Sequence, residues 1–348
     1  MKALTVHPGT QNSAQLADVP EPPEEDGPVL VETLGIGICG TDLEIASGDY
    51  GEAPPGDDYL VLGHESLGRV AEAPSGSGLS KGDLVVGIVR RPDPVPCSNC
   101  AVGEWDMCRN GKYTERGIKA RHGYGSERYR IHPEFAVKVS SDLGDVGVLL
   151  EPTTVVAKAW DHLEKIGHRA HWEPRTVVVT GAGPIGLLAA LLGVQRGLEV
   201  HVLDIVDKGV KPELTKALGA EYHTQSIGEL DLQPDIILEC SGVPQVVVDV
   251  LYQSGHDGVV CLTGVSPVGR KITLDAGSLG REIVLQNDAI FGSVNANRTH
   301  YEQGAQALAD ADKEWLGRLI TRRVPMDSYQ DALDRRKDDV KVVLQIAT

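Results

Sequence analysis

Residues 176–204 read TVVVTGAGPIGLLAALLGVQRGLEVHVLD. An apolar run is followed by a glycine-rich turn, an apolar segment of helical length and a second apolar run that ends at Asp204. This order is typical of a strand, a turn, a helix and the next strand of a parallel sheet. The turn 181-GAGPIG-186 has G-x-G-x-x-G spacing, in which the glycines let a pyrophosphate approach the helix N-terminus. The stretch therefore predicts a dinucleotide-binding fold.

The same alternation continues along the chain. We expect a helix around 212-PELTKALGA-220 and strands at 235-DIILEC-240 and 258-GVVCLTG-264. Strands that alternate with helices indicate a doubly wound, parallel α/β sheet. A glycine-rich turn that binds nothing is the alternative for GAGPIG, but the strand and helix around it favour nucleotide binding.

The first 155 residues have a different character. Short apolar runs such as VLVETLGIGI, LVVGIV and FAVKV are separated by Gly, Pro and Asp, which predicts a barrel-like, β-rich unit. The segment 155-VVAKAWDHLEKIGH-168 has helical spacing and is expected to connect the two domains. The charged final segment ends in the strand-like 340-VKVVLQIA-347, which we expect to fold back onto the first domain.

Composition excludes several classes of partner. The 348 residues include 50 acidic and 33 basic side chains, a net charge of −17, so we expect neither nucleic acid nor an anionic membrane as a partner. The acidic residues are spread along the chain, which suggests a halophilic source. No apolar run approaches the roughly 20 residues of a membrane span, and the N-terminus MKALTVHPG has no leader pattern. We therefore expect a soluble, cytoplasmic protein.

Asp204 bears on the choice of nucleotide. It follows the last glycine of the motif by 18 residues, where a carboxylate would bind the ribose hydroxyls of NAD. A carboxylate there repels a 2′-phosphate, so we expect NAD to be preferred. Lys208 and Lys211 are near enough in sequence to leave NADP open.

Potential metal ligands occur in three stretches, 38-ICGTD-42, 63-GHE-65 and 150-LEPTTVVAKA-159. They contribute a thiolate, an imidazole and two carboxylates: Cys39, His64, Glu65 and Glu151. Mixed sulfur, nitrogen and oxygen ligands with one open position are typical of a catalytic zinc. Each residue alone has a simpler explanation in packing or hydrogen bonding, but the set ahead of a nucleotide-binding domain favours metal chemistry.

The loop 94-PVPCSNCAVGEWDMC-108 contains a second group of potential ligands. Cys97, Cys100 and Cys108 could bind a structural zinc, for which four ligands are usual. Asp93 is the nearest upstream oxygen donor, although Pro94 and Pro96 constrain its approach. A metal-free loop of reduced cysteines is the alternative.

Taken in order, GICGTD, GHE, the cysteine loop, LEP and GAGPIG resemble the zinc-dependent medium-chain alcohol dehydrogenases over essentially the whole chain. Four stretches resemble the microbial glucose dehydrogenase branch, known mainly from archaea: ICGTDLEIASG (38–48), LVLGHESLG (60–68), KYTERGI (112–118) and FGSVNAN (291–297). The resemblance implies a GroES-like catalytic, zinc-binding domain formed by residues 1–158 and 299–348, with a Rossmann domain at 159–298. It also implies a homodimer or homotetramer.

The resemblance also implies roles for individual residues. Zinc would be held by Cys39 and His64, with Glu65 or Glu151. The sugar would contact Thr41, Glu115, Glu151 and Asn295, although Glu115 could instead be a solvated carboxylate paired with Arg116. The coenzyme would be bound by Gly181, Gly183, Pro184, Ile185, Gly186 and Asp204, and its nicotinamide end by Thr263, Gly264, Val265, Ser293, Val294 and Asn295. Two departures are Pro94, where many relatives have a fourth loop cysteine, and Asp204 with Ile205 and Val206, where NADP-binding relatives have arginines.

The implied reaction is oxidation of an aldose, D-glucose above others, at C1 to the aldonolactone with hydride transfer to NAD(P). Thr41 would relay the proton because a hydroxyl both donates and accepts. Two alternatives stay open at this point: a polyol or other secondary-alcohol dehydrogenase of the same family, and a nucleotide-binding or sensing protein without catalysis.

Overall fold

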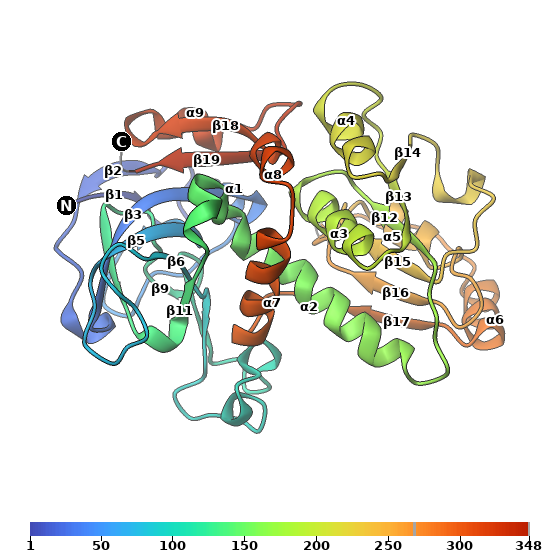
Figure 1. The fold of residues 1–348 in the computed structure, drawn as a ribbon, viewed down its shortest axis with the longest axis horizontal. Helices are drawn as coiled ribbons and strands as arrows, with labels where there is room; N and C mark the ends of the chain where they lie inside the picture. The colour runs from blue at the N-terminus through green and yellow to red at the C-terminus, as the bar shows by residue number, and fades with distance from the viewer. Residues whose placement is uncertain (267–268, 347–348) are drawn as a thin grey trace. The chain divides into compact units, whose positions relative to one another are not determined.

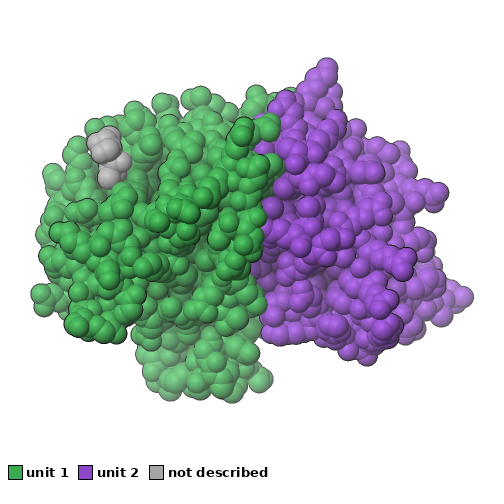
Figure 2. Space-filling model, in the orientation of Figure 1, with its two compact units in different colours: residues 1–154, 295–348 green, residues 155–294 purple. Residues whose placement is uncertain are grey.

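The computed structural model describes residues 1–266 and 269–346 (Figure 1). The chain forms two compact units, residues 1–154 with 295–348 and residues 155–294 (Figure 2). The first unit joins both ends of the sequence, and the second is one continuous segment. We refer to them as unit 1 and unit 2.

Unit 2 is built on a six-stranded parallel sheet with strand order β14-β13-β12-β15-β16-β17. The strands are β12 (Thr176–Thr180), β13 (Glu199–Leu203), β14 (Glu221–His223), β15 (Ile236–Glu239), β16 (Val259–Leu262) and β17 (Ala289–Gly292). The helices are α3 (Pro184–Gln195), α4 (Val210–Ala217), α5 (Pro244–Val250), α6 (Ala276–Gln286) and most of α2 (Leu150–Gly167). The predicted doubly wound sheet is confirmed.

The local sequence explains the first strand, turn and helix of this sheet. Val177, Val178 and Val179 are fully buried in β12, as expected of a strand covered on both faces. Gly181 has φ +88°, which favours glycine. A Cβ on Gly186 would lie 1.7 Å from the Gly181 carbonyl oxygen, so this close contact of helix and turn also requires glycine.

Unit 1 contains a seven-stranded sheet of order β11-β6-β5-β3-β19-β18, with β10 also paired to β3. Its strands are β3 (Val29–Ile38), β5 (Glu65–Glu72), β6 (Leu84–Gly87), β10 (Arg128–Ile131), β11 (Ala136–Lys138), β18 (Ile320–Pro325) and β19 (Lys341–Gln345). Two three-stranded sheets contain β1 (Lys2–Val6), β2 (Gln15–Asp18) and β4 (Leu60–Val61), and β7 (Arg90–Arg91), β8 (Thr114–Arg116) and β9 (Ala120–Arg121).

The C-terminal strand completes the large sheet, since β19 pairs antiparallel with β3 at Val342 and Ile38. The predicted strand over residues 340–347 is thus observed as Lys341–Gln345, and its last residue, Ala347, lies outside the described residues. The other helices of unit 1 are α1 (Gly40–Ala46), α7 (Arg298–Ala309), α8 (Lys313–Leu319) and α9 (Tyr329–Leu333). Within residues 1–266 and 269–346, no helix has both the length and the apolarity that a bilayer crossing requires.

Helix α2 begins earlier than the sequence pattern predicted. The periodic segment was expected to start at residue 155, but α2 starts at Leu150 and includes Glu151 and Pro152 in its first turn. Proline is tolerated there because the first N–H groups of a helix have no partner within it. The earlier start places Glu151 on a regular helix instead of a loop.

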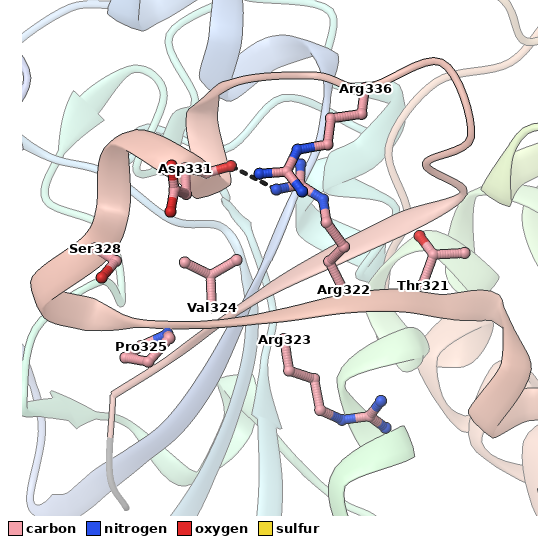
Figure 3. Close-up of a pocket in the computed structure, with 8 residues that line it drawn as sticks. All are labelled: Thr321, Arg322, Arg323, Val324, Pro325, Ser328, Asp331 and Arg336. Carbon is pink, nitrogen blue, oxygen red and sulfur yellow. Dashed lines mark hydrogen bonds between the residues drawn. The ribbon is translucent and has the colours of Figure 1, made fainter.

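A pocket of about 420 Å³ lies beside β18 and α9 in unit 1 (Figure 3). Its lining includes Arg322, whose guanidinium donates to both carboxylate oxygens of Asp339 at 2.7 Å. Arg322 also donates to the backbone carbonyl groups of Asp331 and Asp334. The charge of Arg322 is therefore already satisfied, and no site residue predicted from the sequence lines this pocket.

Candidate active site

Cys39 lies where β3 ends and α1 begins. Its Sγ accepts the N–H of Thr41 at 3.3 Å, and its own N–H donates to Asp42 Oδ2 at 2.9 Å. These reciprocal bonds form a capping box, which satisfies free donors at the start of the helix. The arrangement fixes the thiol in position and places Thr41, which is half-buried, in the first turn of α1.

His64 immediately precedes β5, and its buried ring lies between a thiol and a carboxylate. Nε2 is 3.1 Å from Cys39 Sγ, and Nδ1 is 3.3 Å from Asp42 Oδ1, within ion-pair distance but without hydrogen-bond geometry. Burial alone would lower the pKa of His64, but the charges of Asp42 and Cys39 raise it well above its usual value. A carboxylate behind an imidazole is the arrangement that orients a metal-binding histidine. This role of Asp42 was not predicted from the sequence, although Asp42 is the last residue of the ICGTD motif.

Glu65 is the first residue of β5, and its carboxylate is held by Lys341. The Lys341 Nζ lies 2.7 Å from Oε1 and 2.6 Å from Oε2, and both side chains are almost fully buried. A Cβ at position 37 would lie 2.0 Å from Glu65 Oε2, so Gly37 makes room for this ion pair. Sequence reasoning missed Lys341, and the only signal was a lysine within the apolar strand VKVVLQIA.

Glu151 is also buried but has no such partner. No hydrogen bond or ion pair of its carboxylate occurs within the described part of the chain. Burial raises the pKa of Glu151 to about 7. His64 acts to lower this pKa, and the negative charge of Glu65 acts to raise it. A buried carboxylate without a cation is expected to bind one or to hold a proton.

These residues fit a catalytic zinc. One ligand atom from each of Cys39, His64 and Glu65 lies within 4.8 Å of the others. Sulfur, nitrogen and oxygen ligands together favour zinc over magnesium or calcium. Because Lys341 occupies Glu65, the unpaired Glu151 is the more available of the two carboxylates for a metal or a substrate.

Glu115 belongs to a buried polar network around β7 and β8. Its Oε1 accepts from Arg90 Nε at 3.1 Å, Arg90 Nη2 at 2.9 Å and Asn295 Nδ2 at 2.7 Å. Glu115 is therefore neither solvated nor paired with Arg116, which lies near Asp26 instead. Its Oε2 makes no hydrogen bond among the described residues and is left for a ligand. No pattern in the sequence indicated Arg90.

We expect Glu115→Gln to lower kcat/KM for the sugar about 10- to 100-fold while the chain stays folded. Glutamine can keep the Oε1 acceptor for Arg90 and Asn295, whereas its amide nitrogen replaces Oε2. Hydrogen bonds to a charged group contribute about 1.5–3 kcal/mol. Steady-state kinetics measure the change, with the exposed Glu134→Gln as control. An unchanged kcat/KM would refute a substrate contact at Oε2.

The glycine-rich turn of unit 2 meets the carboxylate of Asp204. Asp204 Oδ2 accepts the Ala182 N–H at 2.7 Å and lies 3.0 Å from Lys211 Nζ, while Oδ1 accepts the Val206 N–H. Gly183 caps α3, which continues through Pro184, Ile185 and Gly186. The predicted dinucleotide-binding residues therefore lie together at the N-terminus of α3. The ion pair with Lys211 partly offsets the negative charge of Asp204.

The segments predicted to contact the nicotinamide follow β16 and β17. Thr263 Oγ1 donates to the Glu239 carbonyl at 2.8 Å, and a Cβ on Gly264 would clash with Gly242 at 2.2 Å. Val265 and Val294 are exposed, whereas Ser293 is buried with an Oγ that lacks a hydrogen-bond partner. Lys158 Nζ donates to the Val294 carbonyl at 3.0 Å, a contact that sequence reasoning missed.

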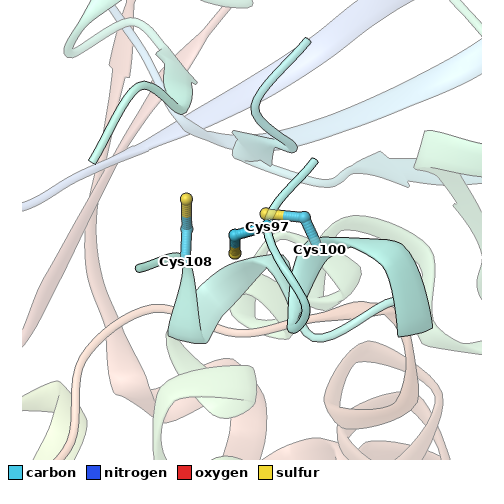
Figure 4. Close-up of side chains that lie close together, drawn as sticks. All are labelled: Cys97, Cys100 and Cys108. Carbon is cyan, nitrogen blue, oxygen red and sulfur yellow. The ribbon is translucent and has the colours of Figure 1, made fainter. Parts of the chain in front are cut away.

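The cysteine loop brings Cys97, Cys100 and Cys108 together (Figure 4). Backbone N–H groups, first that of Arg109, lower the pKa of Cys97 to about 6, while burial raises that of Cys100 to about 11. The Asp93 carboxylate is not in this group of three sulfur ligands. Its Oδ1 accepts the Val95 N–H at 2.8 Å, and its buried Oδ2 has no hydrogen-bond partner.

Comparison with known proteins identifies the family. Residues 144–346 match the family model described as glucose dehydrogenase C-terminus, and residues 25–141 match the alcohol dehydrogenase GroES-like domain. A glucose 1-dehydrogenase from Methanocella arvoryzae is 40% identical, with 99% of each chain covered. The chain belongs to the glucose dehydrogenase family of zinc-dependent medium-chain alcohol dehydrogenases.

Other members of the glucose dehydrogenase family match over the same length. The glucose 1-dehydrogenase of Thermoproteus tenax is 40% identical, with 100% of both chains covered. The structure of Haloferax mediterranei glucose dehydrogenase, in complex with NADP, zinc and gluconolactone, has a TM-score of 0.92, 32% identity and 100% coverage of both chains. The GroES-like match confirms the predicted class of the β-rich domain.

Proposed function

We propose that this chain is a zinc-dependent glucose 1-dehydrogenase, which oxidises D-glucose at C1 to gluconolactone and reduces NAD or NADP. One observation carries the proposal: a ligand atom from each of Cys39, His64 and Glu65 lies within 4.8 Å of the others, in a chain that matches glucose dehydrogenases over its full length. We assign catalysis and zinc binding to unit 1 and nucleotide binding to unit 2. The acidic surface is consistent with the proposed small-molecule substrate.

The proposed mechanism assigns a task to each side chain. Zinc, when held by Cys39, His64 and Glu151, supplies Lewis acidity toward the anomeric hydroxyl. Thr41 accepts the proton of that hydroxyl while it donates its own proton to solvent water. Glu115 Oε2 accepts hydrogen bonds from other sugar hydroxyls and fixes the ring. Hydride then leaves C1 for the nicotinamide, so the sugar loses this hydride to the coenzyme and its hydroxyl proton through Thr41 to water.

Asp93 and the three loop cysteines are proposed as a structural zinc site. Asp93 would have to turn its unpaired Oδ2 toward the sulfurs, or a water would supply the fourth ligand. We also propose a homodimer or homotetramer, as the resemblance implies. Light scattering after size exclusion, at low and high salt, measures the assembly.

A panel of aldoses and polyols, each with NAD and NADP, tests the proposed activity. We expect reduced coenzyme to form with D-glucose and not with open-chain sorbitol. Galactose and xylose in the same panel define how strictly the enzyme selects the sugar. Activity on polyols alone would favour the alternative of a polyol dehydrogenase, and bound coenzyme without any turnover would favour a non-catalytic nucleotide-binding protein.

We propose that NAD is the preferred coenzyme and that Asp204, which follows the last glycine of the motif by 18 residues, binds its ribose hydroxyls. Asp204→Ala is expected to lower kcat/KM for NAD about 10- to 100-fold, the loss of hydrogen bonds to a charged acceptor. The same change removes repulsion of a 2′-phosphate and leaves Lys211 unpaired, so the ratio of NADP to NAD efficiency should rise. Kinetics with both coenzymes measure this ratio, with the exposed Asp207→Ala as control. An unchanged ratio would remove Asp204 from the site.

A further inference from the structure

Two histidines and a glutamate lie together on the edge of the parallel sheet of unit 2, away from the glycine-rich turn in sequence. His201 is on β13, and Glu221 and His223 are on the edge strand β14. In the parallel register His201 pairs with Glu221, and Leu203 pairs with His223. Alternate residues of a strand point to the same face, so the three side chains share one face.

We propose that His201, Glu221 and His223 form a second metal site, which binds zinc or a similar divalent transition-metal ion. The ligand atoms form a triangle: His201 Nδ1 is 2.9 Å from His223 Nε2 and 3.6 Å from Glu221 Oε2, and the latter two atoms are 3.8 Å apart. Tetrahedral zinc with bonds of 2.0–2.2 Å separates its ligand atoms by about 3.3–3.6 Å. The observed distances bracket this range, so shifts of a few tenths of an ångström would admit the ion.

The close contact between the two imidazoles suits a metal. A neutral imidazole is the form that binds metals. The 2.9 Å contact between the two rings has room for only one hydrogen. A metal ion would take the place of that hydrogen.

The other nitrogen of His201 provides an independent observation. His201 is 3% exposed, and its Nε2 is buried without a hydrogen-bond partner. That atom lies 3.4 Å from Glu199 Oε1. If the proton of neutral His201 is on Nε2, then Nδ1 is free to bind a metal. A small movement of the exposed Glu199 would let its carboxylate accept a hydrogen bond from that N–H. A carboxylate in this position orients metal-binding histidines in many proteins.

The surroundings favour a transition metal and allow it to enter. Two imidazole nitrogens and one carboxylate select zinc, cobalt or nickel over magnesium and calcium, which prefer oxygen ligands. The side chain of Glu221 is 66% exposed, so one side of the triangle is open to solvent. Water would complete the coordination from that side.

Metal binding here would fasten the short edge strand to the rest of the sheet. β14 has three residues, and the His223 carbonyl accepts the Asp204 N–H at 3.1 Å. An ion shared by β13 and β14 would therefore also hold the backbone next to the predicted ribose-binding carboxylate. We expect zinc to raise the thermal stability of the chain through this site.

Zinc binding by the full-length chain tests the proposal. The two variants are His223→Gln and Glu221→Gln, of which the second changes only an exposed side chain. The matched control is His171→Gln, because the His171 side chain is 88% exposed and lies 3.5 Å from Glu173, with no third ligand among the described residues. Zinc content per chain is measured by elemental analysis after dialysis against a series of buffered free-zinc concentrations.

We expect both variants to lose one zinc per chain at concentrations where the wild type and the control hold it. Loss of a residue behind a ligand weakens metal binding 10- to 100-fold, so loss of a ligand itself should weaken this site at least about 100-fold. Both variants should also lose the zinc-dependent rise in melting temperature. Equal zinc content in the wild type, both variants and the control at every concentration would overturn the proposal, whatever the outcome for glucose oxidation.

Discussion

Cys39→Ala is expected to lower kcat for glucose oxidation at least about 10³-fold. The change removes the thiol that lies 3.1 Å from His64 Nε2, and with it one ligand of the proposed catalytic zinc. Metal ions contribute several kcal/mol of charge stabilisation in a transition state, and about 4 kcal/mol corresponds to a factor of 10³. Single-turnover kinetics with saturating coenzyme measure the loss.

The loop cysteines provide the matched control. Cys97→Ser also removes a thiolate from a potential zinc site, but none of the residues predicted to contact the sugar lies in this loop. We expect this variant to keep kcat within a few-fold and to lose zinc or stability instead. Zinc content per chain separates the two sites. Full activity of Cys39→Ala after chelation would eliminate the proposed role of the metal.

Lys341→Met is expected to lower the free energy of unfolding by about 3–5 kcal/mol. The substitution leaves the buried Glu65 carboxylate without the ammonium group that lies 2.6–2.7 Å from both its oxygens. Breaking a buried ion pair from one side is costly because the remaining charge is uncompensated. Urea denaturation at constant zinc concentration measures the change.

Two further variants separate a buried charge from lost packing. Adding Glu65→Gln to Lys341→Met removes the uncompensated charge, so we expect the double variant to regain much of the lost stability. Lys138→Met breaks the ion pair between the exposed Lys138 and the partly buried Asp83, which precedes β6, and should cost no more than about 1 kcal/mol. Equal losses in the single and double variants would mean that lost packing, and not the uncompensated Glu65 charge, causes the loss of stability.

Local patterns in the sequence predicted the fold well. The valines of β12, the glycines of the turn and the apolar helix after it are decided by neighbours in sequence, so the parallel sheet could be predicted from residues 176–204. The start of α2 was misplaced because Glu151 and Pro152 fall outside the apolar periodicity. Proline in a first turn gives no reliable signal of its own.

The candidate site was predicted less completely because its partners are far apart in sequence. Glu65 meets Lys341 only because β5 and β19 both pair with β3, and no local pattern encodes that pairing. Glu115 likewise contacts Arg90 and Asn295, which are far from it in sequence and are brought to it by the fold. Sequence motifs identified the potential metal ligands. Only the structure shows that the Glu65 carboxylate is paired with Lys341, whereas the Glu151 carboxylate has no such partner among the described residues.

The central claim is hydride transfer from C1 of glucose, and isotope transfer tests it most directly. The purified chain, with zinc and NAD or NADP, is given D-glucose that carries deuterium at C1, and the reduced coenzyme and the sugar product are analysed by mass spectrometry. We predict that each reduced coenzyme gains one deuterium and that the product is gluconolactone without it. Reduced coenzyme without deuterium, or reduction with sorbitol but not with glucose, would contradict the account.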